Sequence, residues 1–423
     1  MTSVLPSRFS TQDAVAALLQ PVDHHLLLLP PHPELCYCVV IPAKDEADNL
    51  PATLAALATQ VDEQGWALSP HSYEVIVLAN NCQDATAHVV RQAAEAYPQL
   101  VLHVVERILP PAEAHVGKAR RLLMDEAARR LQSVGRPHGI IASTDADTRV
   151  APTWLANIAT EIAVGADAVC GRIMTEAPAL GNYLVRRYYL RDAAYRLLAT
   201  QLEYLLDPNL TDAWPRHHQH FGASFALTAA AYELVGGVPE VPYLEDEALY
   251  QALCRHDLRV RHSPNVRVTT SARYEGRVAV GLSWQLREWA ALSEQLQEPM
   301  VAGVQQLTTL WQARRQLRQL WQAVKSDAYG ANNTMLSKWW PSNKGLADAL
   351  GIQEQTLHQA VGEAATFGAL WQRVQQEQAI RLQWAQRWPP VTLSCALAEL
   401  REVLRHHEQP LVVVPVPTKQ EAV

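Results

Sequence analysis

The sequence predicts an α/β protein with a doubly wound, mostly parallel sheet, followed by a helical C-terminal region. Three observations predict it. Short apolar runs of strand length alternate with amphipathic, helix-length segments from about residue 37 onward, which is the order of repeated β-α-β units. Polar and charged residues directly follow several of these runs. After about Trp289, Gln, Leu, Trp and Ala dominate the composition instead.

Composition narrows the class of protein. The 423 residues suffice for one large or two ordinary domains. A formal net charge of −7 gives no basic excess, so we expect no nucleic-acid partner. The six Cys have no metal-binding spacing and predict reduced thiols. No apolar run reaches the roughly 18 residues of a membrane span, and no secretion signal is recognisable. We therefore expect a cytoplasmic protein without a transmembrane span, with peripheral membrane contact left open.

The alternating part is expected to contain five strands and the helices between them. Each strand is a short apolar run, and each helix carries apolar residues every three or four positions. The strands are expected at 37–42, 73–79, 100–106, 139–144 and 166–173, and the helices at about 49–60, 85–96, 117–131 and from 152 onward. Before them, a capping box at 10–13 predicts a short helix to about residue 20. A Pro-rich lead-in follows that helix.

The rest of the chain is expected to be more helical. A helix at 183–206 carries four arginines among Tyr and Leu. A solvated or partner-facing helix is the first interpretation, and a membrane-surface helix or a wall of an acceptor site are the alternatives. Further elements are a strand at 221–227, a Gly-Gly turn at 236–237, a helix from 245, strands at 258–262 and 266–270, helices at 307–324 and 370–388, and an extended tail. The expected division is 1–35 for the lead-in, 36–290 for the α/β domain and 291–423 for a helical accessory region with this tail.

Asp145 and Asp147 are the first candidate site residues. They follow the fourth expected strand with one residue between them, so they are expected to point to the same side. Two such carboxylates suit Mg²⁺ or Mn²⁺, which keeps waters and phosphate oxygens as its other ligands. Taken by itself, the pair is better explained as a polar turn with Asp as turn former and helix cap. Lys44 and Asn80 also follow strand ends, where doubly wound sheets bind ligands, and this convergence favours a site.

Five segments, in order, resemble the motifs of family 2 glycosyltransferases of the GT-A fold. They are Val40–Glu46, Val77–Thr86, Gly117–Ala119, Thr144–Asp147, and Gly236-Gly237 with Glu245-Asp246. They look like the family's donor-binding start, its VDDGSxDxT segment, its glycine-lysine segment, its DxD motif and its GG…ED pattern. The resemblance covers about residues 36 to 290, and its specificity lies in the order of motifs that are individually weak.

The resemblance implies a metal-dependent, inverting transfer of a sugar from a nucleotide-diphospho-sugar to an unknown hydroxyl acceptor. Asp246 would be the general base, and Asp145 and Asp147 would bind the divalent cation. Donor-binding residues would be Pro42, Ala43, Lys44, Glu46, Asn80, Lys118, Asp145, Arg273 and Arg277. A UDP-sugar is expected first. Asn80 replaces the Asp that usually contacts uracil in the family, which leaves GDP- and dTDP-sugars open.

Other residues limit this interpretation. Gln285–Trp289 lacks the spacing of processive family members, so a non-processive enzyme is expected. Arg273 and Arg277 suit a diphosphate, or they pair with surface acids. His262 is expected to be a core or edge histidine rather than a metal ligand.

Rival readings remain at the level of the whole protein. Glu245–Glu247 would be favoured at a helix start without any catalysis. A sugar-phosphate nucleotidylyltransferase would need a Gly-rich loop after the first strand, where Pro42–Asp45 stands. A non-catalytic sugar-nucleotide-binding protein or helical scaffold is the third reading.

Overall fold

The structure is a computed structural model, and it describes residues 25–176, 183–271, 273, 281–328, 344–380 and 382–407. The expected helix at 10–20, the tail and Arg277 lie outside these residues. Eight strands form one sheet in the order β3-β2-β1-β4-β7-β6-β8-β5. Their bounds are β1 (Tyr37–Ala43), β2 (Tyr73–Asn80), β3 (Val101–Arg107), β4 (Ile140–Ser143), β5 (Thr148–Val150), β6 (Ala168–Thr175), β7 (Phe225–Thr228) and β8 (Val260–Thr270).

The helices divide between the sheet and the C-terminal region. Around the sheet lie α2 (Leu50–Ala58), α3 (Thr86–Ala96), α4 (Val116–Ser133), α5 (Trp154–Ala163), α6 (Tyr183–Leu206), α7 (Ala229–Leu234), α8 (Glu245–Arg255) and α9 (Leu282–Glu294). The C-terminal helices are α10 (Val304–Ala328), α12 (Lys344–Leu350), α13 (Glu354–Glu363), α14 (Phe367–Ile380), α15 (Leu382–Arg387) and α16 (Leu393–His407). Short strands β9 (Met300–Val301) and β10 (Val391–Thr392) pair with each other.

The expected doubly wound, mostly parallel sheet is confirmed. Neighbours among β3, β2, β1 and β4 are all parallel. β7 runs antiparallel to both of its neighbours, and β5 runs antiparallel to β8 at the edge. Because parallel strands end at the same edge of the sheet, the loops after β1, β2 and β4 meet there.

Alternating apolar residues explain why helices cover both faces. In β1, Cys38 and Val40 pack in one core, and Val39 and Ile41 pack in the other. The first core is closed by α4, α7 and α8, and the second by α2, α3 and α5. A strand buried on both faces reads as a continuous apolar run, which is why these strands were visible in the sequence.

Three parts of the expected pattern differ from the structure. Segments 258–262 and 266–270 form one strand, β8, because its pairing with β6 continues across an irregularity: Gly171 pairs with Ser263, and Arg172 pairs with Arg267. The described residues of segment 370–388 belong to α14, which ends at Ile380, and to α15, which begins at Leu382 and ends at Arg387. The start of the expected strand at 221 is instead a short 3-10 turn, η2 (Gly222–Ser224), before β7.

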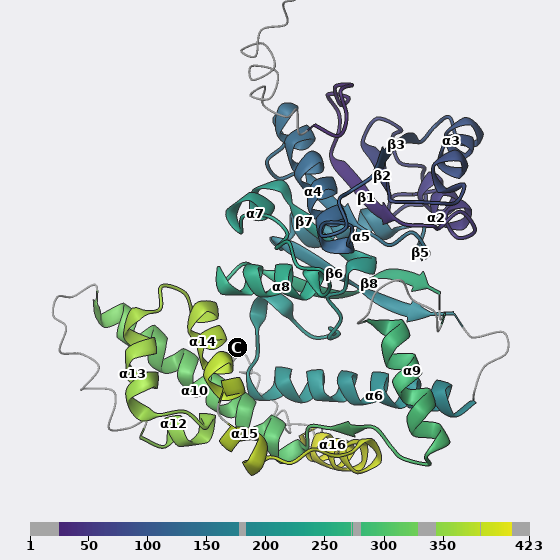
Figure 1. Cartoon of the computed structure of the whole chain (residues 1–423). Coiled ribbons are helices and arrows are strands. Elements are labelled where there is room, and N and C mark those ends of the chain that lie inside the picture. The colour runs from purple at the N-terminus through teal and green to yellow at the C-terminus, as the bar shows by residue number, and fades with distance from the viewer. Residues whose placement is uncertain are drawn as a thin grey trace, which may run out of the picture.

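The C-terminal helices lie together on one side of the molecule, and α6 runs between them and the sheet (Figure 1). Helices α10, α12, α13 and α14 share one apolar core. A second core joins α6 to α16 and to the start of α10, and a third joins α6 to α9. Helices on both sides of residue 290 thus share cores, and the division at this residue stays a prediction.

Candidate active site

A cavity of about 720 Å³ lies at the carboxyl edge of the parallel strands. Nine of the expected site residues line it: Pro42, Ala43, Lys44, Glu46, Asn80, Asp145, Asp147, Asp246 and Arg273. They come from the ends of β1, β2 and β8, from the turn between β4 and β5, and from the start of α8. The fold therefore brings together residues that are up to 231 positions apart, from Pro42 to Arg273.

The two aspartates lie in the turn after β4 rather than on the strand. β4 ends at Ser143, and Ala146 between the aspartates is buried. Asp145 Oδ1 accepts a hydrogen bond from Arg120 Nη2 at 2.9 Å. Asp147 Oδ2 accepts one from Ser271 at 2.7 Å and lies 3.2 Å from Arg273 Nη2. Strand alternation does not place the pair, but both carboxylates do reach the same cavity.

Arg120, which the sequence analysis did not single out, holds the centre of the site. Its side chain is only 4% exposed. Besides Asp145, its guanidinium binds Glu245 Oε1 at 2.9 Å, the carbonyl oxygen of Gly222 at 3.1 Å, and the Ser143 hydroxyl. One side chain thus connects the aspartate turn to the start of α8. Arg120 follows Lys118 by two residues in the sequence. The apolar periodicity of this helix does not show which of the two side chains faces the cavity.

Each acid at the start of α8 has its own partner. Glu245 is buried against Arg120. Asp246 Oδ2 accepts a hydrogen bond from the Gly222 N–H at 2.8 Å, and its side chain lines the cavity. Glu247 is turned away from these contacts and lies 2.5 Å from His220 Nε2, whose hydrogen bond lowers the pKa of this carboxyl. Glu245 and Asp246 both line the cavity, and Asp246 differs from Glu245 in that backbone N–H groups, rather than an arginine, donate hydrogen bonds to its carboxylate.

Close packing and backbone strain occur together beside Asp246. Gly222 packs closely against the Arg120 guanidinium, and a Cβ added to Gly222 would collide with this guanidinium. Leu244, directly before α8, has a φ of 57°, which is a left-handed conformation that bulky residues rarely adopt. Such strain persists only where surrounding structure enforces it, and it clusters at functional sites.

Asp145 is not fully neutralised by Arg120. Burial raises the pKa of this carboxyl from 3.8 to about 6, and Asp147 adds to the rise, while Arg120 opposes it. A raised pKa means that the ionised form lacks compensating charge. The carboxyl side chain is still 38% exposed toward the cavity. A divalent cation held by Asp145 and Asp147 would supply the missing charge, so the residues present fit such an ion.

Arg273 and Glu46 form the second charged pair of the cavity. Arg273 donates two hydrogen bonds to the Glu46 carboxylate, at 2.6 and 3.1 Å, and also lies near Asp147. Of the two roles considered for Arg273, pairing with acids is what the structure contains, but these acids belong to the cavity and not to the surface. Its expected contact with a diphosphate stays a prediction.

Lys118 is the one described residue of the expected donor set that does not line the cavity. Its Nζ lies 3.1 Å from Glu240, and its backbone N–H bonds His115 at the start of α4. Successive residues of a helix point about 100° apart, so Lys118 and Arg120 point to different sides of α4. Arg120 faces the cavity, and Lys118 does not. The donor-binding role of Lys118 stays a prediction.

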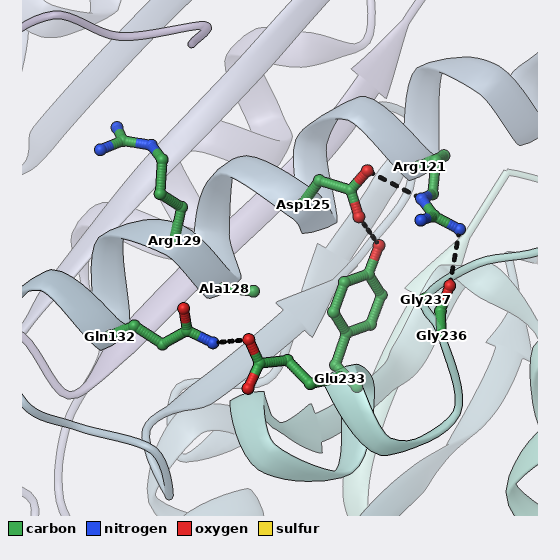
Figure 2. Close-up of a pocket in the computed structure, with 9 residues that line it drawn as sticks. Arg121, Asp125, Ala128, Arg129, Gln132, Glu233, Gly236 and Gly237 are labelled. Carbon is green, nitrogen blue, oxygen red and sulfur yellow. Dashed lines mark hydrogen bonds and ion pairs between the residues drawn. The ribbon is translucent and has the colours of Figure 1, made fainter. Parts of the chain in front are cut away.

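A smaller hollow of about 430 Å³ lies between α4 and the segment formed by α7 and the Gly236-Gly237 turn (Figure 2). There Arg121 bonds the carbonyl oxygen of Gly236 at 2.8 Å and Asp125 at 2.7 Å, and Asp125 accepts the Tyr232 hydroxyl (Figure 2). These bonds fix the Gly236-Gly237 turn, both of whose glycines have positive φ. The expected glycine pair is therefore a structural anchor for the segment that leads to α8.

Two further clusters of possible metal ligands are held by hydrogen bonds within the protein. Asp45, Cys82 and Asp84 have ligand atoms within 4.8 Å of one another. Their carboxylates already accept backbone N–H groups, from Gln83 for Asp45 and from Ala47 and Thr86 for Asp84. His262 is buried, and its Nδ1 lies 2.8 Å from Asp212, as expected for a core histidine.

A cavity at the carboxyl edge of a doubly wound sheet lies where proteins of this architecture bind their ligands, and here it brings a carboxylate pair beside a carboxylate-bearing helix start. Residues 38–216 match the model of the family described as glycosyl transferase family 2. The match covers less than half of the chain, and it confirms that these residues resemble the family, as expected from the sequence. Asp246 and Arg273 lie beyond the matched residues.

Several solved structures are similar to the chain. A mannosyltransferase, PcManGT from Pyrobaculum calidifontis, solved with GDP-Man and Mn²⁺, has 17% identity over 94% of both chains and a TM-score of 0.42. TarS 1–349 from S. aureus has 13% identity over 82% of this chain and 91% of its own, with a TM-score of 0.40. Glucosyl-3-phosphoglycerate synthase from Mycobacterium tuberculosis, solved with Mn²⁺, UDP-Glc and phosphoglyceric acid, has 17% identity over 64% and 83%, with a TM-score of 0.34. No curated protein matches the chain.

Within the described ranges, no helix is both long and apolar enough to cross a membrane.

Proposed function

We propose that the protein is an inverting glycosyltransferase that moves a sugar from a nucleotide-diphospho-sugar to an acceptor hydroxyl. The observation that carries the proposal is the single cavity that joins Asp145, Asp147 and Asp246. A cation-binding carboxylate pair and a separate carboxylate are the two parts that this transfer needs. The match of residues 38–216 to the model of glycosyl transferase family 2 supports the same reaction class.

Asp246 is the proposed general base. The Gly222 N–H holds one of its carboxylate oxygens, which fixes the side chain against the cavity. In the transfer, the bond from the acceptor oxygen to the sugar carbon forms as the bond from that carbon to the diphosphate breaks. The acceptor proton passes to Asp246 as the new bond forms, so a weak base suffices. Attack from the side opposite the diphosphate inverts the configuration at the sugar carbon.

Asp145 and Asp147 are the proposed ligands of Mg²⁺ or Mn²⁺. When bound, the cation offsets the charge that grows on the leaving diphosphate. The protein's own contribution is to hold Asp145 against Arg120, and Asp147 against Ser271 and Arg273. Lys44, Arg273 and Asn80 are proposed to contact the donor from the same side. The donor nucleotide is proposed as uridine first, with guanosine and deoxythymidine as alternatives.

We further propose that the protein works in a reducing compartment such as the cytoplasm. All six cysteines are free, and Cys38 and Cys170 are fully buried. Burial raises the pKa of both thiols well above the usual range, so neither is a reactive thiolate. These cysteines are packing residues of the sheet.

The test is calorimetry of UDP-, GDP- and dTDP-sugars against the whole chain, with Mn²⁺ and with EDTA. We expect one nucleotide class to bind, and its affinity to fall by roughly tenfold or more in EDTA. Asp145→Asn should lose the same metal-dependent part. Asp348→Asn, which changes an exposed acid of the C-terminal helices, is the matched control. Equal affinity with and without the cation would remove the metal from the proposal.

A further inference from the structure

The cavity has a second wall that none of the proposed donor residues occupies. We call it the far wall and define it by Tyr189, Asp192 and Arg196 of α6, His218 before η2, and Trp284 and Trp289 of α9; all six line the cavity. The two helices are held together by an apolar core that includes Trp289. The far wall is therefore a fixed surface of the same cavity that the aspartate turn lines.

Aromatic rings make up one part of the far wall. Trp289 is buried, and its ring meets Tyr189 edge-on at 6.3 Å between centroids. Arg186 lies over the Tyr189 ring at 5.1 Å, and its guanidinium donates a hydrogen bond to the Thr175 hydroxyl at 2.9 Å. Trp284 lines the same cavity but is 44% exposed. The wall thus offers an accessible indole beside two rings that are already packed.

An internally neutral ion pair makes up the second part. Asp192 is buried, and its Oδ2 accepts a hydrogen bond from Arg196 Nε at 2.6 Å. Because the two charges cancel, the pair offers hydrogen-bonding atoms without a net charge. Such a surface is poorly suited to a phosphorylated or carboxylated acceptor, which would need an excess of cations.

His218 adds a buried polar atom without a partner. Within the described part of the chain, its Nδ1 is inaccessible to solvent and makes no hydrogen bond. Burial, and then the nearby Arg196 and neighbouring histidines, lower the pKa of this ring to about 3. The ring is therefore neutral at physiological pH and has one donor and one acceptor nitrogen.

The segment that carries His218 is fixed on both sides. His217 Nε2 lies 3.1 Å from the carbonyl oxygen of Ser263. The Gln219 side-chain amide bonds both the N–H and the carbonyl oxygen of Ile173, at 2.8 and 3.0 Å. Leaving a buried polar atom unpaired on a fixed segment is unfavourable, so a ligand hydroxyl that gains access to this atom on binding would be a favourable partner for it.

We propose that the far wall binds a saccharide, and that the acceptor hydroxyl belongs to this saccharide. The inference rests on the glycosyl transfer proposed above. A sugar ring has an apolar face of C–H groups, which fits the accessible Trp284, and a rim of neutral hydroxyls, which fits Asp192, Arg196 and His218. An aryl alcohol would use the rings alone, and a long-chain alcohol would leave the polar groups unpaired. Transfer then joins the acceptor oxygen to the donor sugar carbon, passes its proton to Asp246, and releases the nucleoside diphosphate.

The experiment is saturation-transfer NMR on the whole chain, with methyl glucoside, methyl mannoside, maltose and cellobiose as saccharide probes. 4-Hydroxybenzyl alcohol and octanol represent the other two classes of acceptor. We expect at least one saccharide to receive saturation. Its affinity should fall roughly tenfold or more in Trp284→Ala and in Asp192→Asn. Trp66→Ala, at a tryptophan that is 74% exposed and does not line the cavity, should bind like the wild type.

His218 has a sharper pair of variants. His218→Gln keeps a donor and an acceptor, and should retain more saccharide affinity than His218→Leu. Equal affinity in these two variants, or saccharide binding that is unaffected by Trp284→Ala, would overturn the inference. So would transfer to the aryl or alkyl alcohol alone. Calorimetry of the nucleotide sugars is read separately: loss of donor binding there overturns the proposed function, whereas the NMR result tests the far wall.

Discussion

Two buried arginines on α4 behave differently at its two ends. Arg130, near the C-terminal end, donates two hydrogen bonds of 2.6 Å to the Glu74 carboxylate on β2 and one to the carbonyl oxygen of Leu29. Arg120, in the second turn, divides its bonds between Glu245, Asp145 and the Gly222 backbone. Both side chains are almost completely buried, at 1% and 4% exposed. One arginine faces a single carboxylate, and the other is shared among several groups.

The carboxylate partners show what this difference means. At Glu74, burial favours the neutral acid, but the hydrogen bonds of Arg130 and His103 prevail and lower the pKa to about 2. At Asp145, burial prevails over Arg120 and raises the pKa to about 6. The first pair is closed and structural, whereas the second leaves a carboxylate that can accept another cation. Perturbed carboxylates of the second kind are enriched at functional sites.

The largest expected effect is at the Asp246 end of the Arg120 network. Asp246→Asn keeps the size of the side chain, so folding and donor binding should survive. Transfer should fall by the roughly 10²–10⁴-fold typical of a lost general base, measured as kcat at saturating donor. Glu247→Gln, whose carboxylate binds His220 instead, should be milder. A dead Glu247→Gln with an active Asp246→Asn would move the base within the triplet, and activity in all variants of Glu245, Asp246 and Glu247 would make the triplet a charge set only.

Arg130→Met should have the next largest effect, and it should be on stability. Removing one partner of a buried pair leaves Glu74 charged and uncompensated, which costs about 3–5 kcal/mol. Denaturant unfolding measures this loss, and calorimetry of the folded fraction should show unchanged donor affinity. Arg136→Met, just beyond the helix on the surface, should stay within about 0.5 kcal/mol of the wild type. A specific loss of donor binding in Arg130→Met would end the contrast between the two arginines.

Arg120→Met should change metal affinity in the opposite sense to transfer. Removing a cation that shares Asp145 should strengthen Mn²⁺ binding at pH 8 by roughly tenfold, although transfer weakens because Asp145 and Gly222 lose their support. Titration calorimetry and steady-state kinetics measure the two effects. Arg121→Met is the control on the next residue, whose bonds go to the Gly236 turn. Unchanged Mn²⁺ affinity in Arg120→Met would exclude Asp145 as a metal ligand.

The smallest expected effect is a difference in titration. In metal-free protein, carboxyl-carbon NMR should give midpoints near pH 2 for Glu74 and near pH 6 for Asp145. Because the folded pKa of Glu74 lies below the reference 4.5, its contribution to stability is present above pH 4.5 and is lost as the pH falls toward 2. For Asp145 the sign is reversed: its contribution is present below pH 3.8 and is lost as the pH rises through 6. Mg²⁺ should lower the Asp145 midpoint and leave Glu74 unchanged.

The same contrast shows what could be predicted from the sequence. Strands such as β1 were visible because every residue on both faces is apolar, and the expected segment 37–42 differs from Tyr37–Ala43 by one residue. The site residues at strand ends were visible because they are polar or charged and directly follow these apolar runs. Arg120 was not, because the choice between it and Lys118 depends on how α4 packs against α8 and η2, which are more than 100 residues away. Local periodicity carries no information about such distant partners, and the far wall of α6 and α9 was hidden in the same way.

The long connection between β6 and β7 bears on how proteins with this sheet can diversify. The chain leaves the sheet at Thr175 and returns at Phe225 in the adjacent strand, and α6 lies in between (Figure 1). Insertions between neighbouring strands leave the register of a sheet unchanged. Recombination could therefore replace what lies beneath the sheet and keep β1, β2 and β4 with the loops at their carboxyl ends intact. Helix α6 shares apolar cores with α9 and α16. The three helices come from three separate places in the sequence, and an exchange that preserves these cores must replace all three together.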